Sequence, residues 1–250
     1  MLDVLIDRDV LYNSRIKIYP NDIFKYTVFN KLIFNPYNAE LINKNNNRVD
    51  YIKSDNPVTR DDSIKRAKDK IFDIAFVNSS LWQFFITLTL DKTKIDRYDK
   101  KEINKRLKAW LHNMSTNYNL NYLIIPEYHK DGAIHFHGLI SGDDLRLSYV
   151  GLDKKGRELY NLDSWRLGFS SCVRLDDNRA AVSSYITKYV TKDTSKILGN
   201  VYYAGGRDLL RDCPAEYCNI DYADFQGREF KIPNTKIKVK YLIAGGCSDE

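Results

Sequence analysis

The chain has 250 residues, of which 43% are hydrophobic and 29% charged, and its formal net charge is +6. This composition predicts a globular protein of one large domain, or of one domain with extensions. The charge permits a nucleic-acid partner without requiring one. The four cysteines form no C-x-x-C pair, which excludes the usual pattern of a structural zinc site, and their scatter does not indicate a disulfide framework.

The first ten residues carry acids where a signal peptide needs bases, and no apolar run is long enough to span a membrane. We therefore expect a cytoplasmic protein with no membrane partner. Residues 1–58 are expected to form an N-terminal extension of short strands and loops, with residues 24–34 as a strand. A capping box of Thr59 and Asp62 then predicts a helix as far as about residue 77.

Residues 81–90 (LWQFFITLTL) alternate in a way that predicts a central strand, with Thr87 and Thr89 on the side opposite the core. Apolar residues at helical spacing predict an amphipathic helix over about residues 99–114. Residues 141–163 are expected to be a polar connection, followed by a strand over about residues 165–175.

Between these elements, residues 121–140 predict a hairpin whose turn contains Asp131 and Gly132. His135 and His137 are two residues apart in its second strand, so both side chains point to one face. Folding the first strand back across the turn brings Glu127 close to His135. Neutral imidazole is a good ligand for divalent metals, so these three side chains are candidate ligands. A hairpin with solvent-facing histidines is the alternative, and for a single His-x-His motif it is the more frequent case.

Residues 179–192 (RAAVSSYITKYVTK) predict a helix, because an apolar residue recurs at every fourth position. Tyr185 and Tyr189 lie one turn apart on an adjoining face, with Lys188 and Lys192 beside them. An ordinary helix with two half-buried tyrosines is the alternative. Residues 196–250 are expected to form a C-terminal extension of strands and turns, in which the lysines at 236, 238 and 240 share one strand face. That face is either solvated or a stripe that contacts phosphates.

Three features thus follow one another: a threonine-bearing strand, a His-x-His hairpin, and tyrosines beside lysines. Phosphodiester cleavage by a side chain needs a metal to neutralise the phosphate and a hydroxyl aligned with the bond. Tyrosine suits this chemistry because phenolate is a tolerable leaving group, so the DNA strand can later be rejoined. Lysine can bind the phosphate or stabilise the phenolate. The sequence contains no G-x-x-x-x-G-K-[ST] motif and so no P-loop ATPase.

On these residues the sequence resembles the HUH endonucleases, and among them the rolling-circle replication initiators of bacterial plasmids and small single-stranded DNA phages. The first motif of that family resembles residues 85–89 (FITLT), and the second is similar to residues 135–138 (HFHG). The third, Tyr-x-x-Lys, occurs twice, as YITK at 185–188 and YVTK at 189–192. The resemblance spans about residues 81–195.

The resemblance implies an α+β fold, with a ferredoxin-like nickase domain over residues 59–195 and the histidines on a central strand of an antiparallel sheet flanked by helices. It implies a metal-dependent tyrosine DNA endonuclease and strand transferase that nicks and rejoins single-stranded or hairpin origin DNA. The products would be a 5′-phosphotyrosine and a free 3′-OH that primes synthesis. A host helicase and polymerase would be partners in the bacterial cytoplasm. The implied ligands of Mn²⁺ or Mg²⁺ are Glu127, His135 and His137, and the implied catalytic residues are Tyr189, Tyr185, Lys192 and Lys188.

Several alternatives stay open at this point. The doubled tyrosine is similar to the two-tyrosine initiators of isometric phages, while KYVTKD also resembles single-tyrosine plasmid enzymes, so one or both tyrosines can act. Tyr189 fits the plasmid-type motif better. A transposase or mobilisation relaxase would use the same chemistry, and a catalytically inactive DNA-binding regulator would use none. A zinc-dependent hydrolase would need a fourth ligand or a helical H-E-x-x-H, which the sequence lacks.

Overall fold

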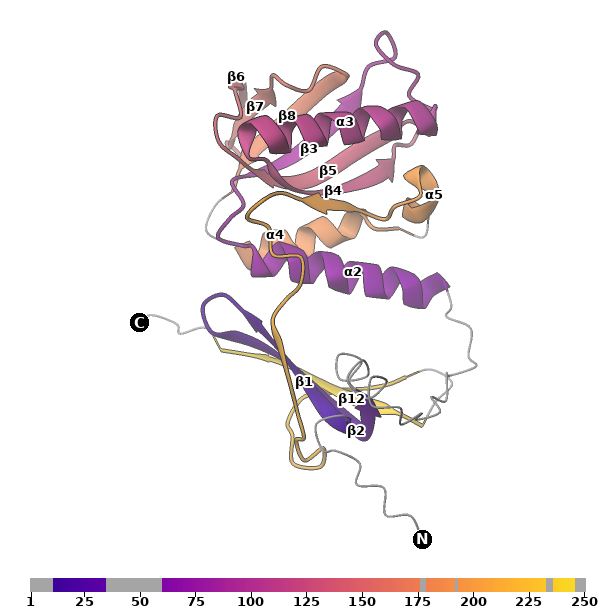
Figure 1. The fold of residues 1–250 in the computed structure, drawn as a ribbon, viewed down its shortest axis with the longest axis vertical. Coiled ribbons are helices and arrows are strands. Elements are labelled where there is room, and N and C mark those ends of the chain that lie inside the picture. The colour runs from indigo at the N-terminus through magenta and orange to yellow at the C-terminus, as the bar shows by residue number, and fades with distance from the viewer. Residues whose placement is uncertain (1–10, 35–59, 176–178, 192, 233–235, 246–250) are drawn as a thin grey trace, which may run out of the picture. The chain divides into compact units, whose positions relative to one another are not determined.

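The computed structural model describes residues 11–34, 60–175, 179–191, 193–232 and 236–245. The chain is α+β with two antiparallel sheets and few helices, which confirms the predicted fold class (Figure 1). It divides into two compact units, one made of residues 1–57 and 213–250 and the other of residues 58–212. None of the described helices is both long and apolar enough to cross a membrane.

The first unit is a five-stranded sheet with the order β10-β1-β2-β12-β11. Its strands are β1 (Leu11–Tyr19), β2 (Ile23–Phe34), β10 (Ala215–Cys218), β11 (Arg228–Lys231) and β12 (Lys238–Ala244). The predicted strand at residues 24–34 is confirmed as β2. Because β12 pairs with β2 and β10 with β1, segments from both ends of the sequence, which we expected to be separate extensions, share one sheet.

Two of the three lysines in the predicted phosphate-contacting stripe are engaged within this unit. The ammonium of Lys238 lies 3.0 Å from a carboxylate oxygen of Glu229. Nζ of Lys240 donates hydrogen bonds to the backbone oxygens of Tyr222, at 2.7 Å, and Phe225, at 2.9 Å. These contacts favour a structural role for both side chains.

The second unit is built on a seven-stranded sheet with the order β6-β7-β8-β3-β5-β4-β9, so β5 lies in its interior. The strands are β3 (Phe84–Leu90), β4 (Asn121–Tyr128), β5 (Ile134–Ser141), β6 (Leu147–Leu152), β7 (Glu158–Leu162), β8 (Gly168–Arg174) and β9 (Tyr203–Gly205). The helical elements are α2 (Arg60–Val77), α3 (Lys100–Tyr118), α4 (Arg179–Ile186), the 3₁₀ turn η1 (Thr187–Tyr189) and α5 (Thr194–Leu198).

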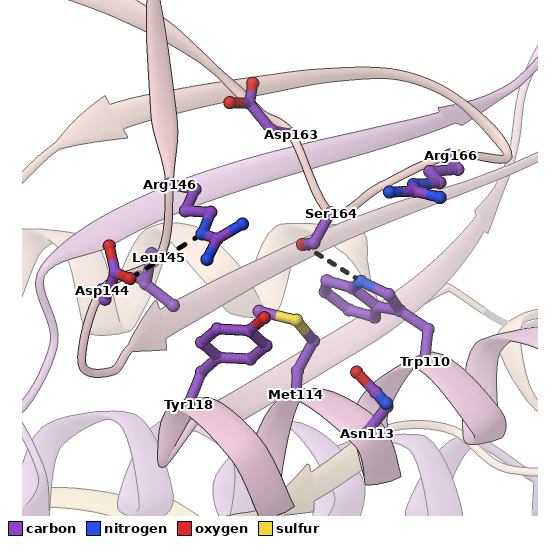
Figure 2. Close-up of a pocket in the computed structure, with 10 residues that line it drawn as sticks. All are labelled: Trp110, Asn113, Met114, Tyr118, Asp144, Leu145, Arg146, Asp163, Ser164 and Arg166. Carbon is purple, nitrogen blue, oxygen red and sulfur yellow. Dashed lines mark hydrogen bonds and ion pairs between the residues drawn. The ribbon is translucent and has the colours of Figure 1, made fainter.

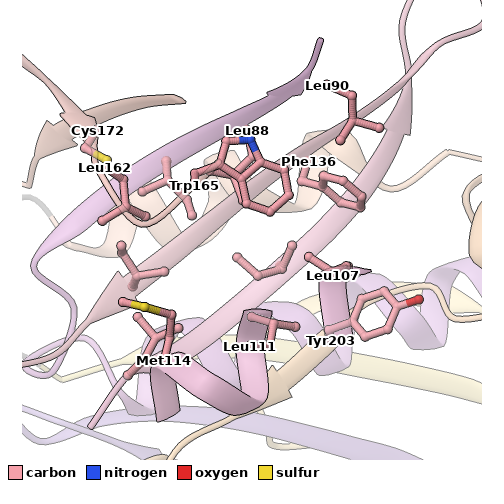
Figure 3. Close-up of a cluster of buried hydrophobic side chains, with 14 of the residues drawn as sticks. Leu88, Leu90, Leu107, Leu111, Met114, Phe136, Leu162, Trp165, Cys172 and Tyr203 are labelled. Atoms are coloured by element: carbon pink, nitrogen blue, oxygen red, sulfur yellow. The ribbon is translucent and has the colours of Figure 1, made fainter. Parts of the chain in front are cut away.

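Helix α3 covers one face of this sheet (Figure 1). It begins after Asp99, whose carboxylate accepts hydrogen bonds from the backbone N–H groups of Lys101 and Glu102. It ends at Asn119, which adopts the left-handed conformation typical of a C-cap. Its apolar stripe packs on the alternate apolar residues of β3 and β5, and Phe136 lies fully buried against Trp165 (Figure 3). The buried residues of α3 are Ile103, Leu107, Leu111 and Met114.

Helices α2 and α4 cover part of the opposite face (Figure 1). The predicted helix before β3 is confirmed as α2, while both residues of its predicted capping box lie outside what the structure describes in side-chain detail. The indole N–H of Trp82 donates to the backbone oxygen of Ala75 at 2.9 Å and joins α2 to the start of β3. The buried residues of this second cluster are Ile71, Ile74, Ala75, Trp82, Leu123, Ile125, Leu139, Ile186, Val190 and Leu209.

Residues 141–163 are not the polar connection that we expected. They contain β6 and β7, an antiparallel hairpin whose turn includes Gly156 at a positive φ of 78°. Strand β6 lies at the edge of the sheet and buries no face, with Tyr149, Val150 and Leu152 all more than half exposed. A strand of this kind needs no alternation of apolar and polar residues, so its sequence carries little period-two signal.

Candidate active site

The hairpin of β4 and β5 forms as the sequence predicts. Its turn is closed by a hydrogen bond from the backbone N–H of Ala133 to the Asp131 carboxylate, at 3.0 Å, and Gly132 takes the positive φ of 82° that such a turn favours. Glu127 is the direct cross-strand partner of His135. The predicted proximity of these two positions is therefore confirmed.

Strand β3 lies on the other side of β5 and adds two hydroxyls to the same face. Thr87 pairs with His137 and Thr89 pairs with His135. Directly paired residues of antiparallel strands point to the same side, so the threonines, the histidines and Glu127 all face away from α3. The α3 core thus holds the strands from behind while their other face presents polar groups.

His137 lies at the centre of this polar face, and its side chain is only 12% exposed. Its Nε2 is 2.8 Å from Oε2 of Glu127, and its Nδ1 is 3.2 Å from the hydroxyl of Thr87. Burial and the neighbouring His135 lower the pKa of His137 to about 4, so the imidazole is neutral at pH 7. We infer that Nε2–H donates to Glu127 while Nδ1 accepts from Thr87. Partial burial also raises the pKa of the Glu127 carboxyl.

His135 takes a different environment although it shares the strand face. Its ring stacks on that of His129, with centroids 4.6 Å apart and planes inclined by 13°. His129, which we considered as a substitute ligand, holds Asp131 through Nδ1 at 3.1 Å. Burial and the neighbouring His129 lower the pKa of His135. The structure therefore brings Glu127 and His137 together and leaves His135 in a stack with His129.

The chemistry of these donors suits a divalent metal, because a carboxylate and a neutral imidazole are both ligands for Mn²⁺ and Mg²⁺ enzymes. The hydrogen bond from Thr87 to His137 is the kind of outer contact that orients a ligating imidazole. Within the described ranges, however, no group of three or more His, Cys, Asp and Glu side chains is arranged to hold an ion. Two of the three predicted donors are in place, and the third is turned aside.

The predicted helix over residues 179–192 is shorter than expected. Helix α4 ends at Ile186, the 3₁₀ turn η1 follows, and Val190 is already extended, with φ −84° and ψ 107°. The hydroxyl of Thr187 bonds to the backbone oxygen of Ser184 at 2.8 Å. Such bonds compete with helical ones, and β-branched residues such as Val190 are weak helix formers, so the helix stops here.

This change of path places Tyr189 directly on His137. The two rings stack with centroids 3.8 Å apart and planes inclined by 17°. The Tyr189 hydroxyl donates a hydrogen bond to the Tyr185 hydroxyl at 2.8 Å, and the two tyrosine rings meet edge to face. Burial, followed by this hydrogen bond, raises the pKa of Tyr189 well above its ordinary value. Both predicted tyrosines therefore reach the polar face of the sheet.

The two predicted lysines differ in what can be said of them. Nζ of Lys188 lies 4.9 Å from the centre of the Tyr185 ring, a cation–π contact that keeps a positive charge beside the tyrosines. Lys192 lies outside the described residues. No role was predicted for Phe85, whose ring lies 5.5 Å from that of Tyr185 and 6.0 Å from that of Tyr189. The alternation of β3 puts Phe85 on the threonine side and was the available signal.

A separate cavity of about 330 Å³ lies on the opposite side of the sheet, beside α3 (Figure 2). Its walls include Trp110, whose indole N–H donates to the Ser164 hydroxyl at 3.3 Å, and Arg146, which pairs with Asp144 at 3.7 Å. None of the predicted site residues lines it. It is therefore distinct from the tyrosine and histidine cluster.

Comparison with protein families gives one match. Residues 83–194 match the model of a replication-associated protein family, that of the ORF2 type, and this segment contains every predicted site residue. No curated protein and no solved structure matches the chain. The match covers somewhat less than half of the chain, and it supports a protein similar to replication initiators.

Proposed function

We propose that this protein is a rolling-circle replication initiator of the HUH type, which nicks and rejoins single-stranded origin DNA through a 5′-phosphotyrosine. The observation that carries the proposal is the stack of Tyr189 on His137, because it joins the candidate nucleophile to the candidate ligand pair. The similarity of residues 83–194 to a replication-associated family supports the same reading.

In the proposed reaction the Tyr189 oxygen attacks the phosphorus, and the bond from phosphorus to the 3′ oxygen breaks. The 3′ oxygen takes a proton from water and leaves as a free 3′-OH, while the 5′ phosphate stays on the tyrosine. The phenol proton leaves along the hydrogen bond to Tyr185, whose side chain is 44% exposed and can pass it to solvent. Lys188 supplies positive charge beside this pair.

The raised pKa of Tyr189 means that the phenol is protonated at pH 7 in the arrangement described. Attack therefore requires that the proton be removed as the bond forms, or that positive charge lower this pKa. We propose Mn²⁺ or Mg²⁺ as that charge, held by Glu127 and His137 with His135 turned in from the same strand face. A bound divalent ion would neutralise the phosphate. His137 would then carry its proton on Nδ1 and donate it to Thr87.

The test is covalent attachment of the protein to single-stranded DNA that carries the origin, with Mn²⁺ present and with EDTA. We expect an adduct with Mn²⁺ and none with EDTA, and its loss in the double variant Tyr185→Phe/Tyr189→Phe. Tyr149→Phe is the matched control, because Tyr149 is a 61% exposed tyrosine of β6 outside the site. An adduct that survives in the double variant would remove these tyrosines from the mechanism, and no adduct from the wild type would favour a DNA-binding regulator.

The single variants separate the two roles. Loss of adduct in Tyr189→Phe with a reduction on the order of 10²-fold in Tyr185→Phe is expected if Tyr189 attacks and Tyr185 carries the proton. Loss in Tyr185→Phe alone would reverse the order. Normal adduct in both single variants, with loss only in the double variant, would indicate two interchangeable nucleophiles.

A further inference from the structure

A cavity of about 590 Å³ opens beside the two tyrosines, between α4 and the sheet. Cavities of this size hold small organic ligands. Tyr185, Tyr189 and Phe85 form an aromatic wall, and Thr87 also lines the cavity next to His137. The cavity is therefore continuous with the candidate active site and extends away from Glu127 toward β7 and β8.

The rest of the lining separates into an apolar part and a charged part. Leu159, Val173 and Val182 supply apolar surface from β7, β8 and α4. Lys155 and Arg157, which come from the turn between β6 and β7, are exposed side chains that also line the cavity. A ligand that suits these walls has a flat apolar portion and a negatively charged portion.

The charge at this end of the cavity can be counted. Asp153 also lines it, and Arg157 pairs with the Asp153 carboxylate through Nη2 at 2.7 Å and Nε at 2.8 Å. Hydrogen bonds from Arg157 lower the pKa of Asp153, so the carboxylate is charged. With one carboxylate neutralised by Arg157, the charge of Lys155 remains. A single positive charge complements the single negative charge of a phosphodiester.

We propose that this cavity binds the base of a nucleotide adjacent to the phosphate that the tyrosines attack, with Lys155 on the neighbouring backbone phosphate. The inference rests on the proposed function, because it names where the flanking DNA lies. Bases stack on aromatic side chains irrespective of sequence, and Tyr185 and Phe85 offer such rings. The β6–β7 hairpin would then act as a DNA-contacting element although it is remote in sequence from the tyrosines.

The binding test uses a fluorescein-labelled single-stranded dT 20-mer and a 20-mer of the same backbone without bases, measured by fluorescence anisotropy. Ala181→Trp fills the cavity from an exposed position of α4. We expect this variant to bind the dT 20-mer about 10-fold more weakly and the abasic 20-mer as well as the wild type does. Lys155→Ala should weaken both, and Lys154→Ala, a neighbouring exposed lysine that does not line the cavity, should weaken neither. Equal binding of both oligomers by Ala181→Trp and the wild type, or equal weakening of both, would overturn the inference.

A second measurement uses the wild-type chain alone. A 20-mer that contains 5-iododeoxyuridine is photo-crosslinked, and the modified peptides are identified by mass spectrometry. We expect crosslinks to Phe85, Tyr185 or Tyr189, and crosslinks confined to residues outside the cavity would contradict the proposal. Neither measurement needs strand cleavage, so the base site can fail while adduct formation succeeds, and the reverse outcome is equally visible.

Discussion

The two faces of the seven-stranded sheet differ in what covers them and in what they carry. On the α3 face, Ile86, Leu88 and Phe136 are fully buried in one large apolar cluster. On the other face, the same strands present Thr87 and His137 beside half-exposed Tyr185. Successive residues of a strand point to opposite faces, so one strand contributes to both. The dry face thus fixes the backbone from which the polar face is built.

The first way to break this comparison is His137→Ala. Loss of this imidazole leaves Glu127 without its hydrogen bond and Tyr189 without its stacking partner. We expect adduct formation to fall on the order of 10³-fold or more, while the free energy of unfolding falls by only about 1–2 kcal/mol. The adduct assay and urea unfolding measure the two effects.

His112→Ala is the matched control for that variant, because His112 is an exposed histidine of α3, on the opposite face. It should change neither adduct yield nor stability. Wild-type adduct yield in His137→Ala would show that the polar face is not the site.

The second variant alters the adjacent residue, which points the other way. Phe136→Ala should lower the free energy of unfolding by about 3–5 kcal/mol, because it leaves a cavity in the α3 cluster. Phe169→Ala removes an equal side chain that is 68% exposed, and it should cost about 0.5 kcal/mol or less. Urea unfolding of both variants gives the comparison, and similar losses would mean that the α3 face does not carry the stability.

A third, smaller effect is expected from Thr87→Val, which keeps the shape of the side chain and removes its hydrogen bond to His137. If this bond orients a metal ligand, the Mn²⁺ concentration needed for half-maximal adduct should rise about 10- to 100-fold. Thr116→Val, at an exposed position of α3, is the control. An unchanged Mn²⁺ titration in Thr87→Val would separate the hydroxyl from metal binding.

The smallest effect concerns the cap of α3. Asp99→Ala removes the acceptor for two backbone N–H groups and should lower the free energy of unfolding by about 1 kcal/mol. Asp69→Ala, at an exposed position of α2, should have little effect. Because the cap lies on the α3 side, adduct yield in folded Asp99→Ala protein should equal that of the wild type. A selective loss of adduct there would couple the two faces more closely than the structure indicates.

Much of the central sheet was predictable from the sequence. The alternation of β3, the turn at Asp131 and Gly132, and the spacing of His135 and His137 determine which side chains share a face, because strand periodicity and hairpin register are local properties. Helix α3 was equally clear, since its apolar stripe and the Asp99 cap lie within one short segment.

Only the tertiary structure decided the remaining features. The sequence does not show that β12 pairs with β2, because that pairing joins segments about 200 residues apart and each strand carries only its own pattern. It did not separate the neighbouring histidines, of which His137 binds Glu127 and His135 stacks on His129. Periodicity assigns a side chain to a face, whereas its rotamer and partners depend on what packs there. The end of α4 at Ile186, which carries Tyr189 onto His137, is decided in the same way by packing against the sheet.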